Sequence, residues 1–183
     1  MDKKKIVKEI VSTLIYIGIV FLMTYLLIHF VGQRTVVDGE SMEATLQNGD
    51  HLIVDKITYR FHDPKRFDII VFPYKHKPNT FYIKRIIGMP GETVQIDLDG
   101  NIYINGEILQ ESYGREVIRP QMIGRAVDPI VLGEDEYFVM GDNRNNSSDS
   151  RTEAVGNIKR EDIVGRAWMR IFPFNNFGIL KHQ

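Results

Sequence analysis

The stretch IVSTLIYIGIVFLMTYLLIHFVGQ, residues 10–33, decides how this chain is organised. Its 24 residues include no Asp, Glu, Lys or Arg, and Glu9 and Arg34 flank it directly. As an α-helix the run is about 36 Å long, enough to cross a hydrocarbon core of about 30 Å with some tilt. We therefore expect one transmembrane helix over residues 10–33.

Two other interpretations of this run fit less well. The first is a buried helix of a soluble domain, but the run is too long and is apolar on every side. The second is a cleaved signal peptide, whose apolar region is shorter and is followed by an A-x-A-like cleavage site that this sequence does not show. An uncleaved signal anchor is the favoured interpretation.

The charges around the run predict its orientation. Four lysines precede it within residues 1–9, whereas only Arg34 follows it directly. Because positive charge accumulates on the cytoplasmic side of a span, we expect residues 1–9 in the cytoplasm and residues 34–183 outside. The chain is thus predicted to be a single-pass protein of the cytoplasmic membrane.

The composition restricts the chemistry of the outer part. The 183 residues include no cysteine and carry a formal net charge of −1. This excludes disulfides, a cysteine nucleophile and cysteine-ligated metals, and it offers no basic surface for nucleic acid. The roughly 150 residues beyond the run are enough for one domain with its own core.

Short apolar or alternating segments dominate beyond residue 35, with Gly-, Pro- and Asn-containing turns between them. We expect a mostly β domain of short antiparallel sheets, with tight turns at Asp99-Gly100 and Asn105-Gly106. Short helices are expected near Ser41 and over residues 160–163, and residues 110–133 read as a loop-rich insertion. The predicted strands are 51–57, 67–72, 81–87, 93–98, 101–109, 136–140 and 166–172.

The sequence gives little support for a metal site. None of the five histidines pair at helical spacing. The loop 142–153 has acidic residues at both ends like a calcium-binding loop, but Arg144 stands at its third position and Ser147 where glycine is needed. We expect neither a metal nor a cofactor.

Lys84 and Ser41 are the residues that suggest catalysis. Lys84 lies inside the apolar segment FYIKRIIG, where burial would lower its pKa far enough for it to act as a general base. Taken alone, it also fits a lysine at a strand edge, and Ser41 fits a turn serine. A Ser-His-Asp triad is a further option, although no histidine lies in a strongly patterned stretch.

Two more stretches have two interpretations each. The loop GDNRNNSSDSR, residues 141–151, is either a solvated loop or a set of buried ion pairs that hold a backbone shape. The tail AWMRIFPFNNFGIL, residues 167–180, either places Trp168 and Phe172 in a last core strand or dips Phe174 and Phe177 into a lipid surface. For the tail, the core strand is the favoured interpretation.

Together, three stretches resemble the boxes of bacterial type I signal peptidases, the membrane-anchored Ser-Lys proteases. GESMEATL is similar to the nucleophile box, an S-M pair usually followed by x-P-T-L. YIKRIIGMPGE is similar to the general-base box, and MGDNRNNSSDSR to the box G-D-N-R-x-x-S-x-D-S-R. They occur in the family's order and spacing behind an N-terminal anchor, and RFDIIVF resembles a further strand box between them.

The resemblance implies a role for each matched residue. Ser41 is the expected nucleophile, Lys84 the general base, and Ser147 the hydroxyl that orients the lysine. The Ser41 backbone N–H is expected in the oxyanion hole, where Gly39 stands at the position from which many relatives supply a second donor. Ala44 stands where relatives usually have proline, and the loss of that proline is expected to loosen the turn. The residues expected to support the site are Met42, Asp142, Arg144, Asp149 and Arg151.

The resemblance also implies a function. We expect a serine endopeptidase that removes signal peptides from exported preproteins after small, A-x-A-like residues, at the outer face of the membrane and near the export translocon. Its partners would be preproteins and the lipid bilayer. The alternatives are an inactive or non-enzymatic membrane-anchored binding protein, and a self-cleaving protease of the repressor type. The last would need a DNA-binding segment where residues 10–33 lie.

Overall fold

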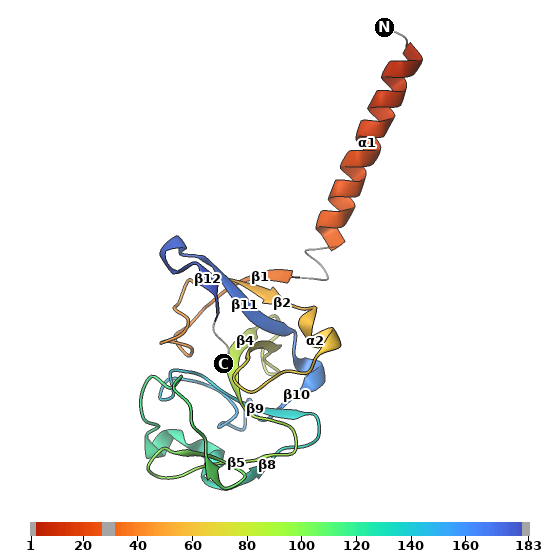
Figure 1. The fold of residues 1–183 in the computed structure, drawn as a ribbon. Helices are drawn as coiled ribbons and strands as arrows, with labels where there is room; N and C mark the ends of the chain where they lie inside the picture. The colour runs from red at the N-terminus through yellow and green to blue at the C-terminus, as the bar shows by residue number, and fades with distance from the viewer. Residues whose placement is uncertain (1–2, 27–31, 181–183) are drawn as a thin grey trace.

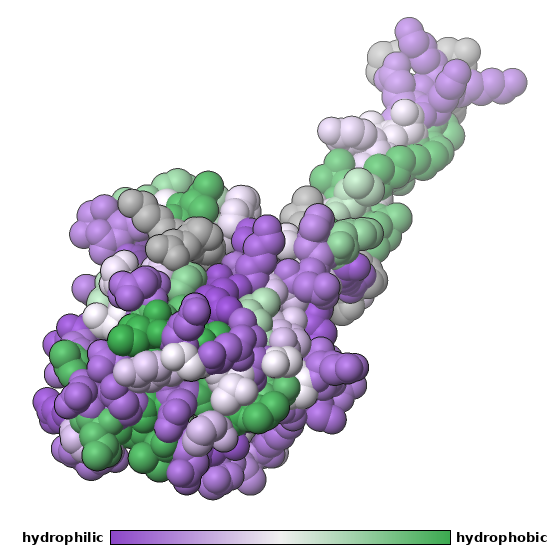
Figure 2. Space-filling view, turned by 60° about the horizontal axis from the view of Figure 1, so that its bottom comes forward, coloured by the Kyte–Doolittle hydropathy of each residue, from purple (hydrophilic) through white to green (hydrophobic). Residues whose placement is uncertain are grey.

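The computed structural model describes residues 3–26 and 32–180. One long helix, α1 (Lys3–Leu26), projects from a β domain that holds most of the chain (Figure 1). The apolar surface of α1 is continuous below a hydrophilic N-terminal end (Figure 2). Among the described residues, α1 is the one helix long and apolar enough to cross a membrane.

The observed bounds of this helix differ from the predicted 10–33. The helix begins seven residues earlier, because the lysine-rich start consists of good helix formers that continue its first turns. Its last described residue is Leu26, and residues 27–31 of the predicted span lie outside the described residues. Gly32 and Gln33 instead begin a strand, since they pair with Asp55 and Val54.

The β domain contains two antiparallel sheets. The eight-stranded sheet has the order β1-β2-β11-β3-β4-β9-β10, with β12 paired to β11, and the four-stranded sheet has the order β7-β6-β5-β8. The strands are β1 (Gly32–Val36), β2 (His51–Asp55), β3 (Ile69–Pro73), β4 (Phe81–Gly88), β5 (Thr93–Ile96), β6 (Ile102–Ile104), β7 (Glu107–Ile108), β8 (Ile130–Val131), β9 (Glu136–Met140), β10 (Ile158–Lys159), β11 (Gly165–Phe172) and β12 (Gly178–Ile179).

The structure confirms the mostly β fold and each predicted strand, with shifted ends. The predicted strand 101–109 is divided into β6 and β7 by Asn105 and Gly106, whose φ angles of 53° and 84° suit a two-residue hairpin turn. Strand β1 was missed, because its sequence GQRTV has neither alternation nor an apolar run. Pairing with β2 makes it a strand.

The two short-helix predictions had different outcomes, and the one near Ser41 was wrong. Residues 41–45 form a turn rather than a helix, because Ala44 adopts a φ of 98° that no helix contains. Residues 160–162 form a short 3-10 helix, η4 (Arg160–Asp162), so the short helix predicted over residues 160–163 is present with a shifted end. The other short helical elements are α2 (Thr58–Phe61), η2 (Pro120–Met122), η3 (Gly124–Val127) and η5 (Phe174–Asn176).

The segment 110–133 is irregular, as expected, but it is not a peripheral loop. Ile118, Ile123, Ala126 and Leu132 are buried in one core cluster with the strands of the small sheet and Phe138. Strand β8, within the same segment, pairs with β5. The segment therefore completes the core beneath the four-stranded sheet.

The aromatic tail is a strand but not a core strand. Trp168 and Phe172 lie on β11, yet they are 37% and 44% exposed, so the favoured core interpretation was wrong for them. Phe174 and Phe177 are 80% and 60% exposed. Phe174 begins η5 and Phe177 follows it directly, in the connection between the paired strands β11 and β12.

Candidate active site

Ser41 lies on a turn between β1 and β2 that hydrogen bonds hold at both ends. Val37 N–H donates to Asp50 O at 2.8 Å, and Gly49 N–H donates to Val37 O at 2.9 Å. Below the turn, Met42 is 1% exposed and packs in a core cluster with Leu46. Met42 thus anchors the turn from beneath and leaves its neighbour Ser41 facing a surface hollow.

The turn departs from an ordinary helical geometry at two residues. Gly39 has a φ of 110°, and its N–H donates to Asn48 Oδ1 at 2.9 Å. The expectation that the Gly39 region supplies a second oxyanion donor is therefore not met by this N–H, which already has a partner. Ala44 has a φ of 98°, which proline with its φ near −65° cannot adopt. The turn is held in a left-handed form rather than loosened.

Lys84 lies on β4, opposite Ile70 of β3, and is 3% exposed. Its Nζ donates to Ser41 Oγ at 2.8 Å and to Ile83 O at 3.0 Å. The Tyr82 ring lies 4.9 Å from the same nitrogen. Residues 43 positions apart in sequence thus meet within a single hydrogen bond.

The surroundings of Lys84 make its neutral form accessible. Burial lowers its pKa from 10.5 to about 8, against the opposing charges of Asp149 and Asp142, and Arg151 adds to the lowering. An amine with a pKa near 8 is partly neutral at physiological pH, and its lone pair can then accept a proton from the hydroxyl beside it.

Asp149 and Arg151 form a buried pair within the loop 141–151. Arg151 Nε donates to Asp149 Oδ1 and Arg151 Nη2 to Asp149 Oδ2, both at 2.8 Å. Burial acts to raise the pKa of Asp149, but hydrogen bonds from Arg151 and from the Gly141 N–H outweigh it, so the pKa lies below its usual range. The carboxylate therefore stays ionised. The buried-pair interpretation of this loop was correct.

Asp142 pairs with Arg85, a residue that sequence reasoning did not single out. Arg85 Nε donates to Asp142 Oδ1 at 2.9 Å and Nη2 to Oδ2 at 2.7 Å, and both side chains are fully buried. Thr45, at the end of the turn that holds Ser41 (residues 41–45), donates to the same carboxylate at 2.5 Å. The guanidinium stacks 3.6 Å from the Tyr113 ring. The sequence feature that could have identified Arg85 is its place inside an otherwise apolar predicted strand.

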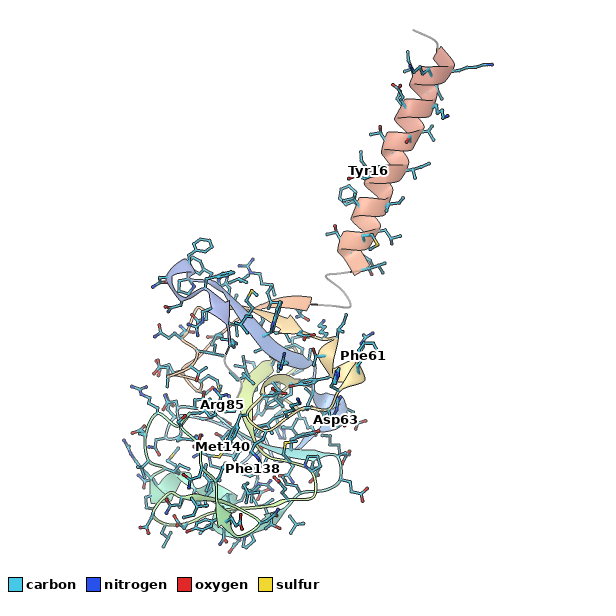
Figure 3. All side chains as sticks on the ribbon, in the orientation of Figure 1. Tyr16, Phe61, Asp63, Arg85, Phe138 and Met140 are labelled. Carbon is cyan, nitrogen blue, oxygen red and sulfur yellow. The ribbon has the colours of Figure 1, made fainter. Side chains whose placement is uncertain are left out.

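Figure 3 places Arg85 in the middle of the β domain, near Met140 and Phe138. Arg85 of β4 and Met140 of β9 lie directly opposite each other where these two strands pair. The Arg85 side chain reaches from β4 to both the turn that holds Ser41 and the loop 141–151. It therefore ties together the three segments that form the candidate site.

The loop 141–151 also contacts the Ser41 turn directly. Asn143 N–H donates to Ser41 O at 3.0 Å, and Asn143 Nδ2 donates to Glu40 O at 3.1 Å. Arg144 pairs with Glu111 at 2.5 Å and donates to Gly141 O at 3.1 Å, so it joins the loop to segment 110–133. Asn143 and Glu111 were missed, because only long-range contacts give them a role.

Ser147 lies at the site without the expected contact to the lysine. Its hydroxyl is buried and reaches no hydrogen-bond partner of normal geometry among the described residues, although it faces Asp149 closely enough to help lower the pKa of that carboxyl. It also lies against Gly141, where an added Cβ would collide with Ser147 Oγ and with the Ser41 carbonyl. Glycine at 141 is therefore required by close packing.

Ser41 and Lys84 open onto a hollow of about 470 Å³. One wall is the segment 35–41 and the other is Phe81–Lys84, with Asn146 and Ser148 at one end. No group of three or more His, Asp or Glu side chains placed to hold a metal occurs in the described part of the chain. The chemistry available in this hollow is that of a hydroxyl beside a weakly basic amine.

Residues 8–172 match the family described as "Signal peptidase, peptidase S26". The chain belongs to this family. The resemblance seen in the motifs is thus confirmed, and the protein is a signal peptidase I enzyme, a protease that removes signal peptides from preproteins.

Signal peptidase relatives match along most of the chain. A probable signal peptidase I-2 of Synechocystis is 41% identical over 82% of this chain and 68% of its own. A signal peptidase I P of Bacillus subtilis subsp. natto is 38% identical over 96% of this chain and 97% of its own. A solved signal peptidase I from Enterococcus faecalis shares 33% identity and a TM-score of 0.46, over 57% of this chain and 97% of that one.

Proposed function

We propose that this signal peptidase cleaves preproteins with Ser41 as nucleophile and Lys84 as general base, at the outer face of the cytoplasmic membrane. The observation that carries the proposal is the 2.8 Å contact between Lys84 Nζ and Ser41 Oγ, made by a buried lysine whose pKa is lowered to about 8. A nucleophile and base within hydrogen-bond reach are the minimum for covalent catalysis by a hydroxyl.

The backbone around the hollow suits an extended substrate. Strand β9 pairs with β4 only from Arg85 onward, so Phe81–Lys84 have β3 on one side and no strand on the other among the described residues. This unpaired strand edge lines the same hollow as residues 36–40. A cleavage segment bound as an added strand here would place small, A-x-A-like residues in the hollow, with the scissile carbonyl at Ser41.

The reaction then follows from the positions of the groups. Neutral Lys84 takes the Ser41 hydroxyl proton as Oγ attacks the scissile carbonyl. The Ser41 N–H, which has no hydrogen-bond partner among the described residues, stabilises the oxyanion. The Lys84 ammonium returns the proton to the leaving amine when the peptide bond breaks. A water molecule, deprotonated by Lys84, hydrolyses the acyl-enzyme, and the proton returns to Ser41 Oγ. No cofactor is needed.

Activity should rise with pH through an ionisation near 8 and level off above it. The reason is that only the neutral amine accepts a proton, and burial lowers the pKa of Lys84 from 10.5 to about 8. The measurement is kcat/KM for a preprotein between pH 6 and 10. A rate that stays flat through this range, with chemistry limiting, would contradict a lysine base.

The topology of the proposal rests on α1 and on the lysines at its start. Helix α1 serves as an uncleaved anchor with residues 1–9 in the cytoplasm, and the β domain lies outside, where signal peptides emerge beside the translocon. Gly32, at the start of β1, follows the last described residue of α1 by six positions, so the first residue of the β domain lies within about 21 Å of the end of the described helix.

Single cysteines should report this topology, because the natural chain contains none. In intact cells, a membrane-impermeant thiol reagent is expected to label Glu153→Cys, which is exposed on the β domain, and to leave Lys5→Cys unlabelled. Permeabilised cells should label both. Labelling of Lys5→Cys alone in intact cells would show the opposite orientation.

A non-enzymatic binding protein was the alternative expected from the sequence, and membership of the signal peptidase I family argues against it. The intact Ser41–Lys84 contact argues against it, because a buried lysine that served only structure would more often form an ion pair than contact a hydroxyl. The loss of cleavage expected from the dyad variants, described in the Discussion, separates these two functions.

A further inference from the structure

A second hollow, of about 540 Å³, adjoins the hollow at Ser41. The two share Glu40 and Asn146, whose side chains are joined by a hydrogen bond from Asn146 Nδ2 to Glu40 Oε2 at 3.2 Å. If the signal peptide fills the first hollow up to Ser41, the chain beyond the scissile bond must leave it. The second hollow, which we call the exit groove, adjoins the first beside the nucleophile.

Hydrogen bonds hold the walls of the exit groove in place relative to Ser41. Asn143, in its floor, binds the carbonyls of Ser41 and Glu40. Asn145 Oδ1 accepts from the Arg119 N–H at 2.9 Å, and Asn145 Nδ2 donates to Val117 O at 2.9 Å. Segment 110–133 therefore forms one wall of the groove and the loop 141–151 the other.

The charges of the exit groove leave one carboxylate uncompensated. Arg115 pairs with Glu43 of the nucleophile turn, and Arg119 lies 3.6 Å from Glu116. Glu40 is exposed and has no cationic partner among the described residues; its contact is the neutral Asn146 amide. Because Glu43 offsets Arg115 and Glu116 offsets Arg119, Glu40 is the one carboxylate among the described residues of the groove without a cationic partner. It lies next to Ser41, within reach of a side chain just past the scissile bond.

We propose that the exit groove binds the first residues of the mature part of the preprotein, and that Glu40 selects basic over acidic side chains there. The inference rests on the proposed cleavage at Ser41 and extends it to the other side of the scissile bond. Glu40 acts here on specificity rather than on the dyad, because the charges that act on Lys84 are those of Asp149, Asp142 and Arg151.

The test compares three preproteins that differ only at the first three residues after the cut, which are all Lys, all Gln or all Glu. The readout is the ratio of kcat/KM for the Lys and Glu substrates, in which any general loss of activity cancels. For wild type at low salt we expect a ratio of about 2 to 5 for each charge that contacts Glu40, the range of exposed ion pairs. The ratio should fall toward one at about 1 M salt.

Four variants test whether residues of the exit groove cause this preference for basic over acidic substrates. Glu40→Gln should bring the ratio close to one, and Glu40→Lys should invert it. Arg119→Gln, which frees Glu116, should raise it above the wild-type value. Glu134→Gln removes the same charge from an exposed position on the turn before β9 and should leave the ratio at the wild-type value.

The outcomes separate this proposal from the cleavage mechanism. A wild-type ratio of one, or a ratio that Glu40→Lys leaves unchanged, would overturn the proposal that Glu40 selects basic side chains. Cleavage of the Gln substrate would still support the Ser41 mechanism in that case. Failure of the wild-type enzyme to cleave any of the three substrates would overturn both. A ratio that follows the sign of the charge at position 40 establishes the groove.

Discussion

Replacing Ser41 with alanine is expected to lower the rate of signal-peptide cleavage by about 10³-fold or more, and replacing Lys84 with alanine or methionine by a similar factor. Each change removes one partner of the 2.8 Å contact on which the proposed activation of Ser41 depends. Residues that act as a unit are strongly non-additive, so the double variant should be no worse than either single variant by more than a small factor.

The measurement is processing of a preprotein by the full-length enzyme in membranes, with the amount of enzyme matched. Ser112→Ala and Lys159→Ala change the same residue types outside the site and should cleave at nearly the wild-type rate. Lys84→Met retains most of the buried side-chain volume, so its fold should be kept. Near-normal processing by either dyad variant would contradict the mechanism.

Replacing Arg85 with methionine is expected to lower the free energy of unfolding by about 3–5 kcal/mol. The change leaves the Asp142 carboxylate buried and without its bidentate partner, and an uncompensated buried charge is among the most costly defects in a protein interior. The stacked contact with Tyr113 is lost as well. Urea unfolding of the full chain in detergent measures the effect.

Two further variants identify the cause of this loss. The double variant Arg85→Met with Asp142→Leu removes the unpaired charge and should recover part of the stability, which a simple cavity would not. Lys75→Met breaks an ion pair of 3.2 Å whose lysine is 55% exposed, and it should cost less than about 1 kcal/mol. Equal losses for Arg85→Met and Lys75→Met would contradict the buried-pair interpretation.

The strand content was predictable because it depends on short-range patterns. Alternation and turn residues such as Asn105-Gly106 report local backbone preferences, and these agreed with the final sheets. The turn after Gly39 was predicted as a helix because its composition permits one. Its left-handed Ala44 is imposed by contacts on either side, from Met42 in the core and from Thr45 on Asp142.

The supporting residues of the site were less accessible to sequence reasoning. Asp142 and Asp149 were recognised from a motif, but their partners were assigned only in part: Arg151 was named, whereas Arg85 was not. Asn143, Glu111 and Tyr113 carry no local signal, because each acts through a contact with a residue distant in sequence.

The sequence by itself determined the apolar anchor, the β-rich domain and the residue types that carry the chemistry, since hydropathy, periodicity and motif order are properties of neighbouring residues. Only the tertiary structure decided that Lys84 is buried, that it contacts Ser41, and that segment 110–133 lines a hollow beside the Ser41 turn. Desolvation and hydrogen bonding depend on which distant segments pack together, and it is this packing that turns an ordinary lysine into one with a pKa near 8.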